Sequence, residues 1–158
     1  MISITRRFEF DYGHRVLGHE GKCATLHGHR GVAEVTVVPI GAVSRDEPGL
    51  DSLGRVIDFS CLKRIVGTWI DENWDHAMIL NTEDPFFKMW EGWSEREQVR
   101  LMGPRTPYSL ICCNPTAENL AVFLHGQVDI LLESRGLRCV NVRFRETPNC
   151  WADSRDML

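Results

Sequence analysis

The sequence lacks a cysteine framework. Its six cysteines, at positions 23, 61, 112, 113, 139 and 150, form no C-x-x-C pair, and a chain of 158 residues is long enough to bury a core without disulfide bridges. It also lacks an apolar run near the roughly 20 residues that span a bilayer. The opening "MISITRRFEF" alternates like a strand and does not resemble a signal peptide. These absences indicate a cytosolic protein whose cysteines are mostly reduced and in the core.

An excess of positive charge is absent too. The formal net charge is −4, from 18 basic and 22 acidic side chains, so nothing global indicates nucleic acid or an anionic membrane as a partner. A small anionic substrate stays open, because local charge decides its binding. No internal repeat and no low-complexity stretch divides the chain. We therefore expect one domain over residues 1–158.

Hydrophobic periodicity predicts the first elements. Residues 2–14 alternate, with apolar even positions apart from Arg6, which predicts a half-buried strand that places His14 on its apolar face. A β-branched run predicts a second strand over 32–39. Apolar residues at helical spacing follow Asp58, which is expected to be the N-cap of a helix. A second helix is expected to begin at Asn114 as N-cap and to end at Gly136.

The remaining elements follow from the same patterns. Residues 139–147 read as a strand with Val140, Val142, Phe144 and Glu146 on one face, and a short strand is expected near 150–152. Between the two helices lies an insert at about 82–110. Within it Asp84-Pro85 predicts a short helix through about Trp93, and "YSLICC" is a candidate added strand. The predicted order is β-β-α-insert-α-β-β.

The stretch "CATLHGH", residues 23–29, carries the first candidate site. On an extended backbone His27 and His29 point to one face, and Gly28 lets a ligand approach closely. With His14 from the neighbouring strand, three neutral imidazoles could hold Zn²⁺ and leave a fourth position open, which is the catalytic arrangement. An H-x-H pair also arises by chance in strands, so the pair alone does not decide. His19 and His125 have no supporting pattern and read as surface residues.

Cys23 has three readings that spacing does not separate. It could be a small buried hydrophobe, or a fourth ligand that closes a structural zinc site. It could also be a base or nucleophile beside the metal, with its thiolate favoured by the cation and by Lys22 or Arg15.

Two carboxylates add further candidates. Asp75 is followed directly by His76 in the apolar "WDHAMIL", where the two could form a proton relay or, alternatively, a helix cap and a satisfied core histidine. Glu146 extends an apolar strand face. A carboxylate there could pair with a guanidine-like edge such as the N–H pair of a pterin, or it could turn to solvent.

Six blocks in order carry a family resemblance: "FEFDYGHR", "CATLHGH", "VIDFSCLK", "WDHAMIL", "NPTAENLA" and "RFRET". Together they resemble the 6-pyruvoyl-tetrahydropterin synthase superfamily over most of the chain, apart from roughly residues 82–110. The resemblance implies the tunnelling fold (T-fold), an α+β fold in which two helices cover one face of a four-stranded antiparallel sheet. It also implies trimers stacked into homohexamers, with sheets closing into barrels and sites at subunit interfaces.

The resemblance also implies roles for matching residues. His14, His27 and His29 would bind zinc, Cys23 would be the catalytic thiol, and Asp75 with His76 the acid/base pair. Glu146 would anchor the pterin ring, and Thr116 at the start of the second helix would touch it.

The spacing C-x3-HGH resembles the carboxy-type branch, whereas pyruvoyl-type members resemble C-x5-HGH. The implied reaction converts 7,8-dihydroneopterin triphosphate to 6-carboxy-5,6,7,8-tetrahydropterin with release of acetaldehyde and triphosphate, for queuosine and other 7-deazaguanines. The alternatives are a pyruvoyl-type lyase on the same substrate and a non-catalytic pterin-binding module. Arg15, Lys22 and Arg30 are candidate contacts for the triphosphate, and Arg30 departs from the small polar residue that relatives often carry after HGH.

Overall fold

The computed structural model describes residues 2–41, 49–103 and 108–155. In chain order the elements are β1 (Ile4–His14), η1 (Lys22–Ala24), β2 (His27–Pro39), α1 (Phe59–Leu62), η2 (Lys63–Gly67), α2 (Thr68–Asn73), β3 (Ala77–Asn81), α3 (Pro85–Glu91), α4 (Glu95–Met102), β4 (Tyr108–Ile111), α5 (Ala117–Leu132), η3 (Glu133–Arg135), β5 (Leu137–Thr147) and β6 (Cys150–Asp153). The described part of the chain contains no helix that is both long and apolar enough to cross a membrane.

One sheet organises these elements, in the strand order β4-β3-β1-β2-β5-β6. Strands β1, β2, β5 and β6 are antiparallel neighbours, which confirms the predicted α+β fold with its four-stranded antiparallel sheet. Strands β3 and β4 extend it beyond β1 in parallel pairing. The sequence predicted an added strand at β4 but missed β3, because the five residues of "AMILN" are too short and too uniformly apolar to show a period.

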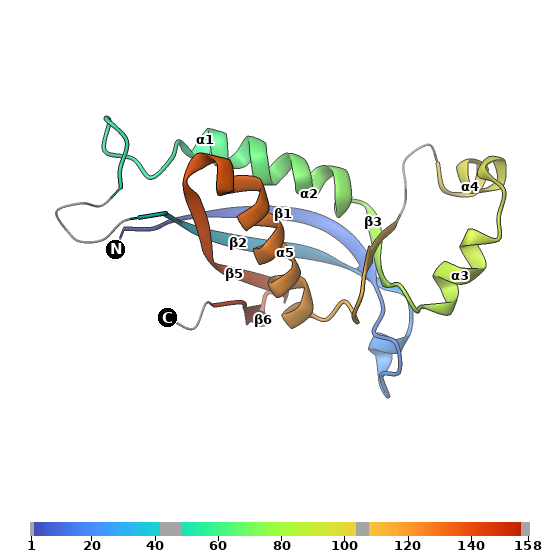
Figure 1. Ribbon diagram of the computed structural model, residues 1–158. Coiled ribbons are helices and arrows are strands. Elements are labelled where there is room, and N and C mark those ends of the chain that lie inside the picture. The colour runs from blue at the N-terminus through green and yellow to red at the C-terminus, as the bar shows by residue number, and fades with distance from the viewer. Residues whose placement is uncertain (1, 42–48, 104–107, 156–158) are drawn as a thin grey trace.

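Helices α1, α2 and α5 cover one face of the sheet, whereas α3 and α4 lie beyond its β3–β4 end (Figure 1). α1, η2 and α2 follow one another along one side of that face, and α5 lies across β5 and β6. The core forms where inward side chains of the strands, such as Phe10, Val35 and Phe144, meet Leu62, Val66 and Leu124 of the helices. The predicted alternation of the first strand is confirmed, since Phe8, Phe10, Tyr12 and His14 are all buried. On the opposite face β1 exposes the polar side chains of Thr5, Arg7, Glu9 and Asp11.

A β-bulge sets which side chains of β5 face the core. Residue Thr36 of β2 pairs with Asn141, but Val37 pairs with Cys139, so Val140 is skipped in the ladder. The prediction that Val140 shares a face with Val142, Phe144 and Glu146 is therefore wrong for Val140. This bulge leaves the alternation from Val142 to Phe144 unchanged. A second register shift, in the pairing of β5 with β6, lies at Glu146, whose carboxylate nevertheless reaches His14 and His29.

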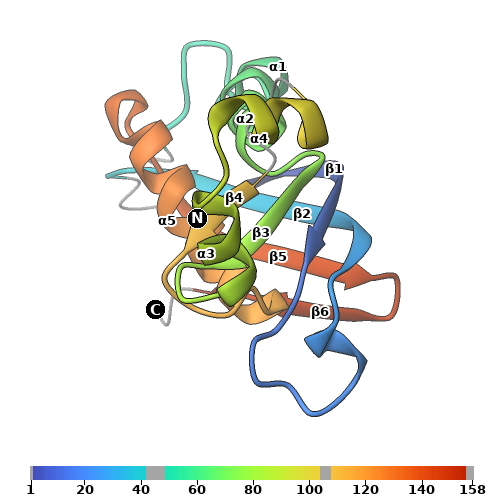
Figure 2. The same cartoon turned by 90° about the vertical axis from the view of Figure 1, so that its right-hand side faces the viewer.

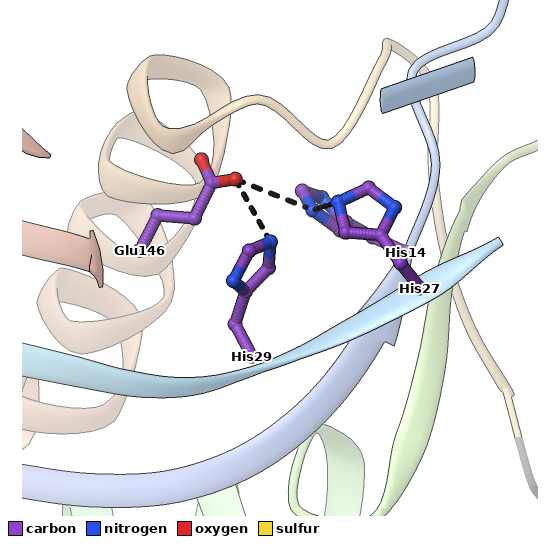
Figure 3. Close-up of side chains that lie close together, drawn as sticks. All are labelled: His14, His27, His29 and Glu146. Atoms are coloured by element: carbon purple, nitrogen blue, oxygen red, sulfur yellow. Dashed lines mark hydrogen bonds and ion pairs between the residues drawn. The ribbon is translucent and has the colours of Figure 1, made fainter. Parts of the chain in front are cut away.

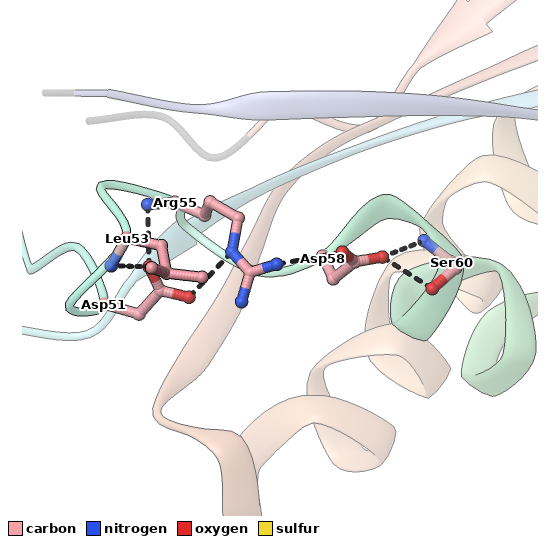
Figure 4. A network of polar contacts seen from close by, with 5 residues as sticks. All are labelled: Asp51, Leu53, Arg55, Asp58 and Ser60. Atoms are coloured by element: carbon pink, nitrogen blue, oxygen red, sulfur yellow. Dashed lines mark hydrogen bonds and ion pairs between the residues drawn. The ribbon is translucent and has the colours of Figure 1, made fainter.

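Side-chain hydrogen bonds determine where the helices α1 and α5 begin. Asp58 caps α1 as predicted, because its carboxylate accepts hydrogen bonds from the Ser60 amide at 2.8 Å and from the Ser60 hydroxyl. Arg55 bridges Asp58 and Asp51 and orders the loop before the helix (Figure 4). The N-cap of α5 is Thr116, not Asn114 as predicted. The Asn114 side chain instead bonds the backbone of Leu17.

The inserted segment forms α3, α4 and the strand β4. Asp84 is the N-cap of α3, as predicted, and its buried carboxylate accepts from the Phe86 amide at 2.8 Å. Helix α3 ends at Glu91, two residues before the predicted end. Trp90 is buried against Tyr108, with 5.2 Å between ring centroids, so this tryptophan is a packing residue that joins α3 to β4.

Two expectations about burial are wrong. All six cysteines are free, but only Cys139 is fully buried, while Cys112 and Cys150 are exposed. His125 is buried instead of lying on the surface, and its Nδ1 is 2.8 Å from the Ser154 hydroxyl. The reason is tertiary: α5 packs against both β5 and β6, so a wider stripe of the helix is covered than its apolar residues predict.

We expect the side chains that α5 buries in the core to contribute far more to the stability of the protein than its exposed side chains. Leu124 is completely buried, whereas Val122 on the same helix is 63% exposed. Leu124→Ala should lower the free energy of unfolding by roughly 2–5 kcal/mol, because it removes buried methyl groups and leaves a cavity. The matched Val122→Ala should change it by less than about 0.5 kcal/mol. Denaturant titration checks both values, and equal costs for the two variants would contradict this packing.

Candidate metal centre

Three histidines and one glutamate converge where β1 meets β2 (Figure 3). His14 ends β1 and pairs with His27, which begins β2, while Tyr12 pairs with His29. Glu146 approaches from β5. One ligand atom from each of the four residues lies within 4.8 Å of all the others. The structure thus brings together the three histidines expected to bind metal, and it adds the carboxylate that the sequence suggested for substrate.

Backbone carbonyls fix the tautomers of two of these rings. The Nδ1 atom of His14 is 2.7 Å from the Pro115 carbonyl oxygen, and Nδ1 of His27 is 2.6 Å from that of Thr25. A carbonyl oxygen only accepts, so each Nδ1 carries a proton, and in the neutral ring the lone pair is then on Nε2. The two Nε2 atoms are 3.1 Å apart. Two lone pairs that face each other at this distance are an arrangement that a cation between them would stabilise.

His29 completes the donor set. Its Nε2 atom is buried and has no hydrogen-bond partner in the described structure, although Glu146 Oε1 lies 3.0 Å away at ion-pair distance. Burial lowers the pKa of both His14 and His29 below 6.5, against the opposing effect of Glu146. Both rings are therefore neutral at pH 7, which is the form that binds metal. Three imidazoles and a carboxylate fit a borderline-soft divalent cation such as Zn²⁺.

Tyr12 forms the inner wall of this group. Its ring centroid lies 5.2 Å from that of His14 and 5.9 Å from that of His29. Its hydroxyl is buried without a hydrogen-bond partner in the described structure, and burial raises the pKa of Tyr12 far above its usual value. Tyr12 thus stays neutral and keeps the inner side of the group apolar. The alternation of the first strand placed Tyr12 beside His14, so the signal for this residue was present in the sequence.

Cys23 lies in η1, in the loop that joins His14 to His27, and is half-buried. Within the described residues, the group that could hold a metal contains no thiol. The geometry therefore does not favour the closed Cys-His₃ reading, and Cys23 is left as a candidate for chemistry in the loop between two of the histidines.

The Asp75–His76 pair is formed but lies apart from the three imidazoles. Asp75 accepts from the Asp11 amide at 3.0 Å, and its other oxygen is 2.9 Å from Nδ1 of His76. Asp11 points to the polar face of β1, opposite to His14. His76 is not buried as its apolar context indicated: its side chain is 72% exposed. It lines an open groove of about 800 Å³ that also reaches His27 and His29.

The remaining candidates lie around this group. Thr116 caps α5 through its hydroxyl, which accepts from the Asn119 amide at 3.3 Å, next to the Pro115 carbonyl that holds His14. Two of the cations suggested for a triphosphate are already paired. Arg15 forms a two-pronged ion pair with Asp84, and Arg30 bonds Glu9 at 3.1 Å. Lys22, in η1, is exposed.

Removal of one imidazole should abolish tight metal binding. We expect His14→Ala and His27→Ala to weaken Zn²⁺ affinity by more than about 100-fold, since even loss of a partner outside the ligand set costs 10–100-fold. His19→Ala, in the same loop but exposed and outside the group, is the matched control and should bind one Zn²⁺ per chain. Isothermal titration and elemental analysis measure this. Full zinc content in either ligand variant would refute the site.

Known proteins share this architecture. The family described as 6-pyruvoyl tetrahydropterin synthase matches residues 3–156. A 6-carboxy-5,6,7,8-tetrahydropterin synthase of Rickettsia bellii is 40% identical over 154 residues, which covers 97% of this chain and 99% of that protein. An uncharacterised protein of Wolinella succinogenes, WS1659, has a solved structure that superposes with a TM-score of 0.74 at 25% identity and covers 98% of each chain.

The 6-pyruvoyl tetrahydropterin synthase of Caenorhabditis elegans, at 20% identity and a TM-score of 0.60, shares the fold over 98% of this chain and 95% of its own. The family match spans nearly the whole sequence, the insert included. The resemblance inferred from six short blocks is thereby confirmed: the chain belongs to the 6-pyruvoyl tetrahydropterin synthase family.

Proposed function

We propose that this protein is a zinc-dependent carbon–carbon lyase that converts 7,8-dihydroneopterin triphosphate to 6-carboxy-5,6,7,8-tetrahydropterin, acetaldehyde and triphosphate. One observation carries the proposal: three imidazoles converge with Glu146 on one place, at the ends of a loop that carries a free cysteine. The names of the relatives that are 35–40% identical over 97% of the chain support the same reaction.

Each residue has a chemical task in this reaction. His14, His27 and His29 would hold Zn²⁺, which when bound polarises oxygens of the substrate's side chain. The Cys23 thiolate would accept a proton from a carbon of that side chain. His76, oriented by its 2.9 Å contact with Asp75, would give a proton to, or take one from, the other side.

Glu146 and Thr116 would orient the ring. The Glu146 carboxylate lies at the edge of the metal group and offers two oxygens to the N–H pair of a pterin, a bidentate pairing. Thr116 stands at the start of α5, beside the carbonyl that fixes His14. The pterin ring and the metal would thus bind next to each other, with Glu146 and Thr116 beside both.

The pyruvoyl-type reaction on the same substrate is the second candidate, because the family itself bears that name. The C-x3-HGH spacing favours the carboxy-type reaction. A non-catalytic pterin-binding module needs no acid/base pair, so the intact Asp75–His76 contact speaks against it. We place the reaction in the cytoplasm, in the synthesis of queuosine and other 7-deazaguanines. The six free cysteines are compatible with a reducing compartment.

The site also favours a homo-oligomer. The Asp75–His76 pair lies outside the metal group of its own chain, although His76 lines the same open groove as His27 and His29. In the described residues β1 pairs with β3 only at Tyr12–His14, so the edge from Ile4 to Phe10 has no strand beside it. Pairing of that edge with another copy would extend the sheet and bring a second chain's residues near. We propose a hexamer, as a dimer of trimers, with sites shared between chains.

The reaction itself is tested by its products. Zinc-loaded protein with 7,8-dihydroneopterin triphosphate should yield 6-carboxy-5,6,7,8-tetrahydropterin and acetaldehyde by mass spectrometry. Cys23→Ala should lower kcat by about 10²–10⁴-fold, the usual contribution of a general base. Cys112→Ala, an exposed cysteine outside the metal group, should match the wild type. Accumulation of 6-pyruvoyl-tetrahydropterin would instead establish the second candidate.

Sharing of sites between chains is tested by complementation. Cys23→Ala and His76→Ala should each be inactive alone. Co-expressed and purified together, they should regain part of the activity, because some sites of a mixed oligomer receive both native residues. If the mixed oligomers stay as inactive as the single variants, each site is built from one chain.

A further inference from the structure

The loop that carries Cys23 is held by a few short-range bonds of its own and by contacts with other elements. Residues 15–26 project from the end of the sheet between β1 and β2 (Figure 1, Figure 2). The short helix η1 has no buried residue and no side-chain cap. The backbone bonds from Ala24 to Gly21 and from Thr25 to Lys22 stay within the η1 turn, and the one from His19 to Val16 stays within the first arm. The bond from the Val16 amide to the Cys23 carbonyl, at 2.8 Å, ties that first arm to the cysteine. The position of Cys23 therefore depends on what holds the residues beside Val16.

Asn114 holds the residue on one side. Its side-chain oxygen accepts from the Leu17 amide at 3.0 Å, and its side-chain nitrogen donates to the Leu17 carbonyl at 2.8 Å. One amide group thus satisfies both backbone groups of a loop residue, as a neighbouring strand would. The Asn114 backbone is fixed in turn, because its carbonyl accepts from the Thr116 amide and from the Asn119 side chain, each at 2.8 Å.

The next residue along the chain serves the metal group. The carbonyl of Pro115 accepts the Nδ1 proton of His14 at 2.7 Å. Two consecutive residues before α5 therefore hold two different parts of the site: Asn114 holds the thiol loop, and Pro115 holds a metal ligand. This arrangement fixes the loop relative to the three imidazoles.

Arg15 anchors the loop on the other side of Val16. Its guanidinium binds the Asp84 carboxylate with two contacts, one of them from Nε at 2.7 Å. Asp84 is completely buried and belongs to the inserted segment, where it caps α3. Burial would raise the pKa of Asp84, but the bonds from Arg15 and the Phe86 amide outweigh it and lower the pKa, so the carboxylate stays charged. A charged, bidentate pair is a stiff anchor.

We propose that Asn114 is a positioning residue for Cys23, with the Arg15–Asp84 pair of the inserted segment as its second anchor. The proposal rests on the proposed function in assigning proton transfer to Cys23. To accept a proton from carbon, the thiolate must lie within hydrogen-bond distance of that proton. A misplacement of about 1 Å lowers the rate on the order of 100-fold. The described hydrogen bonds of the Asn114 side chain run to Leu17 and, at 3.5 Å, to the Asn81 side chain of β3. None of them reaches a ring of the metal group or Glu146, so its effect on the site passes through the loop.

The test compares Asn114→Ala with the conservative Asn114→Asp, which keeps the acceptor for the Leu17 amide but cannot donate to its carbonyl. Arg15→Lys weakens the second anchor. Asn141→Ala, which removes a 3.1 Å bond to Asp153 elsewhere in the sheet, is the matched control. For each variant we would measure zinc content, thermal stability, kcat and KM. The rate at which iodoacetamide alkylates Cys23 would be followed on its own peptide.

Asn114→Ala should keep one zinc per chain and a KM close to wild type, lose about 10- to 100-fold in kcat, and show faster alkylation of Cys23. Asn114→Asp and Arg15→Lys should fall between it and the wild type, and Asn141→Ala should behave as wild type. If Asn114→Ala does not fold, the same measurements on Asn114→Asp and Arg15→Lys test the proposal.

Two results would overturn the proposal: unchanged kcat and alkylation in folded Asn114 variants, or a fall in kcat that only follows loss of zinc. The alkylation rate needs no turnover. Should the wild type fail to convert the pterin while alkylation still rises in Asn114→Ala, the proposed function fails and the positioning role stands.

Discussion

Two backbone carbonyls determine what the metal group can bind. By accepting the Nδ1 protons of His14 and His27, Pro115 and Thr25 leave lone pairs on both Nε2 atoms, 3.1 Å apart. Without these bonds each ring could rotate or exchange its tautomer, and the pair could relax into an ordinary N–H···N contact. With them, the protein is preorganised for a cation. The proposed reaction needs these imidazoles to hold the metal in a fixed place. The proposed roles of the thiol loop and of a second chain are defined relative to that place.

The sheet brings the donors together, and the core buries His14 while His27, His29 and Glu146 stay partly exposed. The register of β1 with β2 sets His14 opposite His27, and the pleat turns His14 to the same face as Phe8, Phe10 and Tyr12. That face is covered by the helices, so the imidazoles lie at the end of the hydrophobic core. Burial there lowers the pKa of His14 and His29, which keeps them neutral. The packing that stabilises the fold thus also prepares the ligands.

The sequence predicted correctly those features that depend on one residue type and its near neighbours in the chain. Period-two alternation placed His14 inward, Asp58 and Asp84 marked helix starts, and H-x-H marked the metal group. Prediction from sequence failed where the role of a residue depends on a partner far away in the chain. Asn114 looked like a helix cap because its role at Leu17 spans 97 residues of sequence, and Arg15 looked free because its partner Asp84 lies in the insert. His125 is buried only because β6 passes beneath α5.

The central claim is that three imidazoles hold zinc while Cys23 stays outside the ligand set. X-ray absorption on the zinc-loaded wild type tests it directly, because sulfur and nitrogen ligands differ in distance. The account predicts nitrogen and oxygen scatterers near about 2.0–2.1 Å, with imidazole outer shells and no sulfur. A sulfur scatterer near about 2.3 Å would contradict it, since it would make Cys23 a ligand of a closed site.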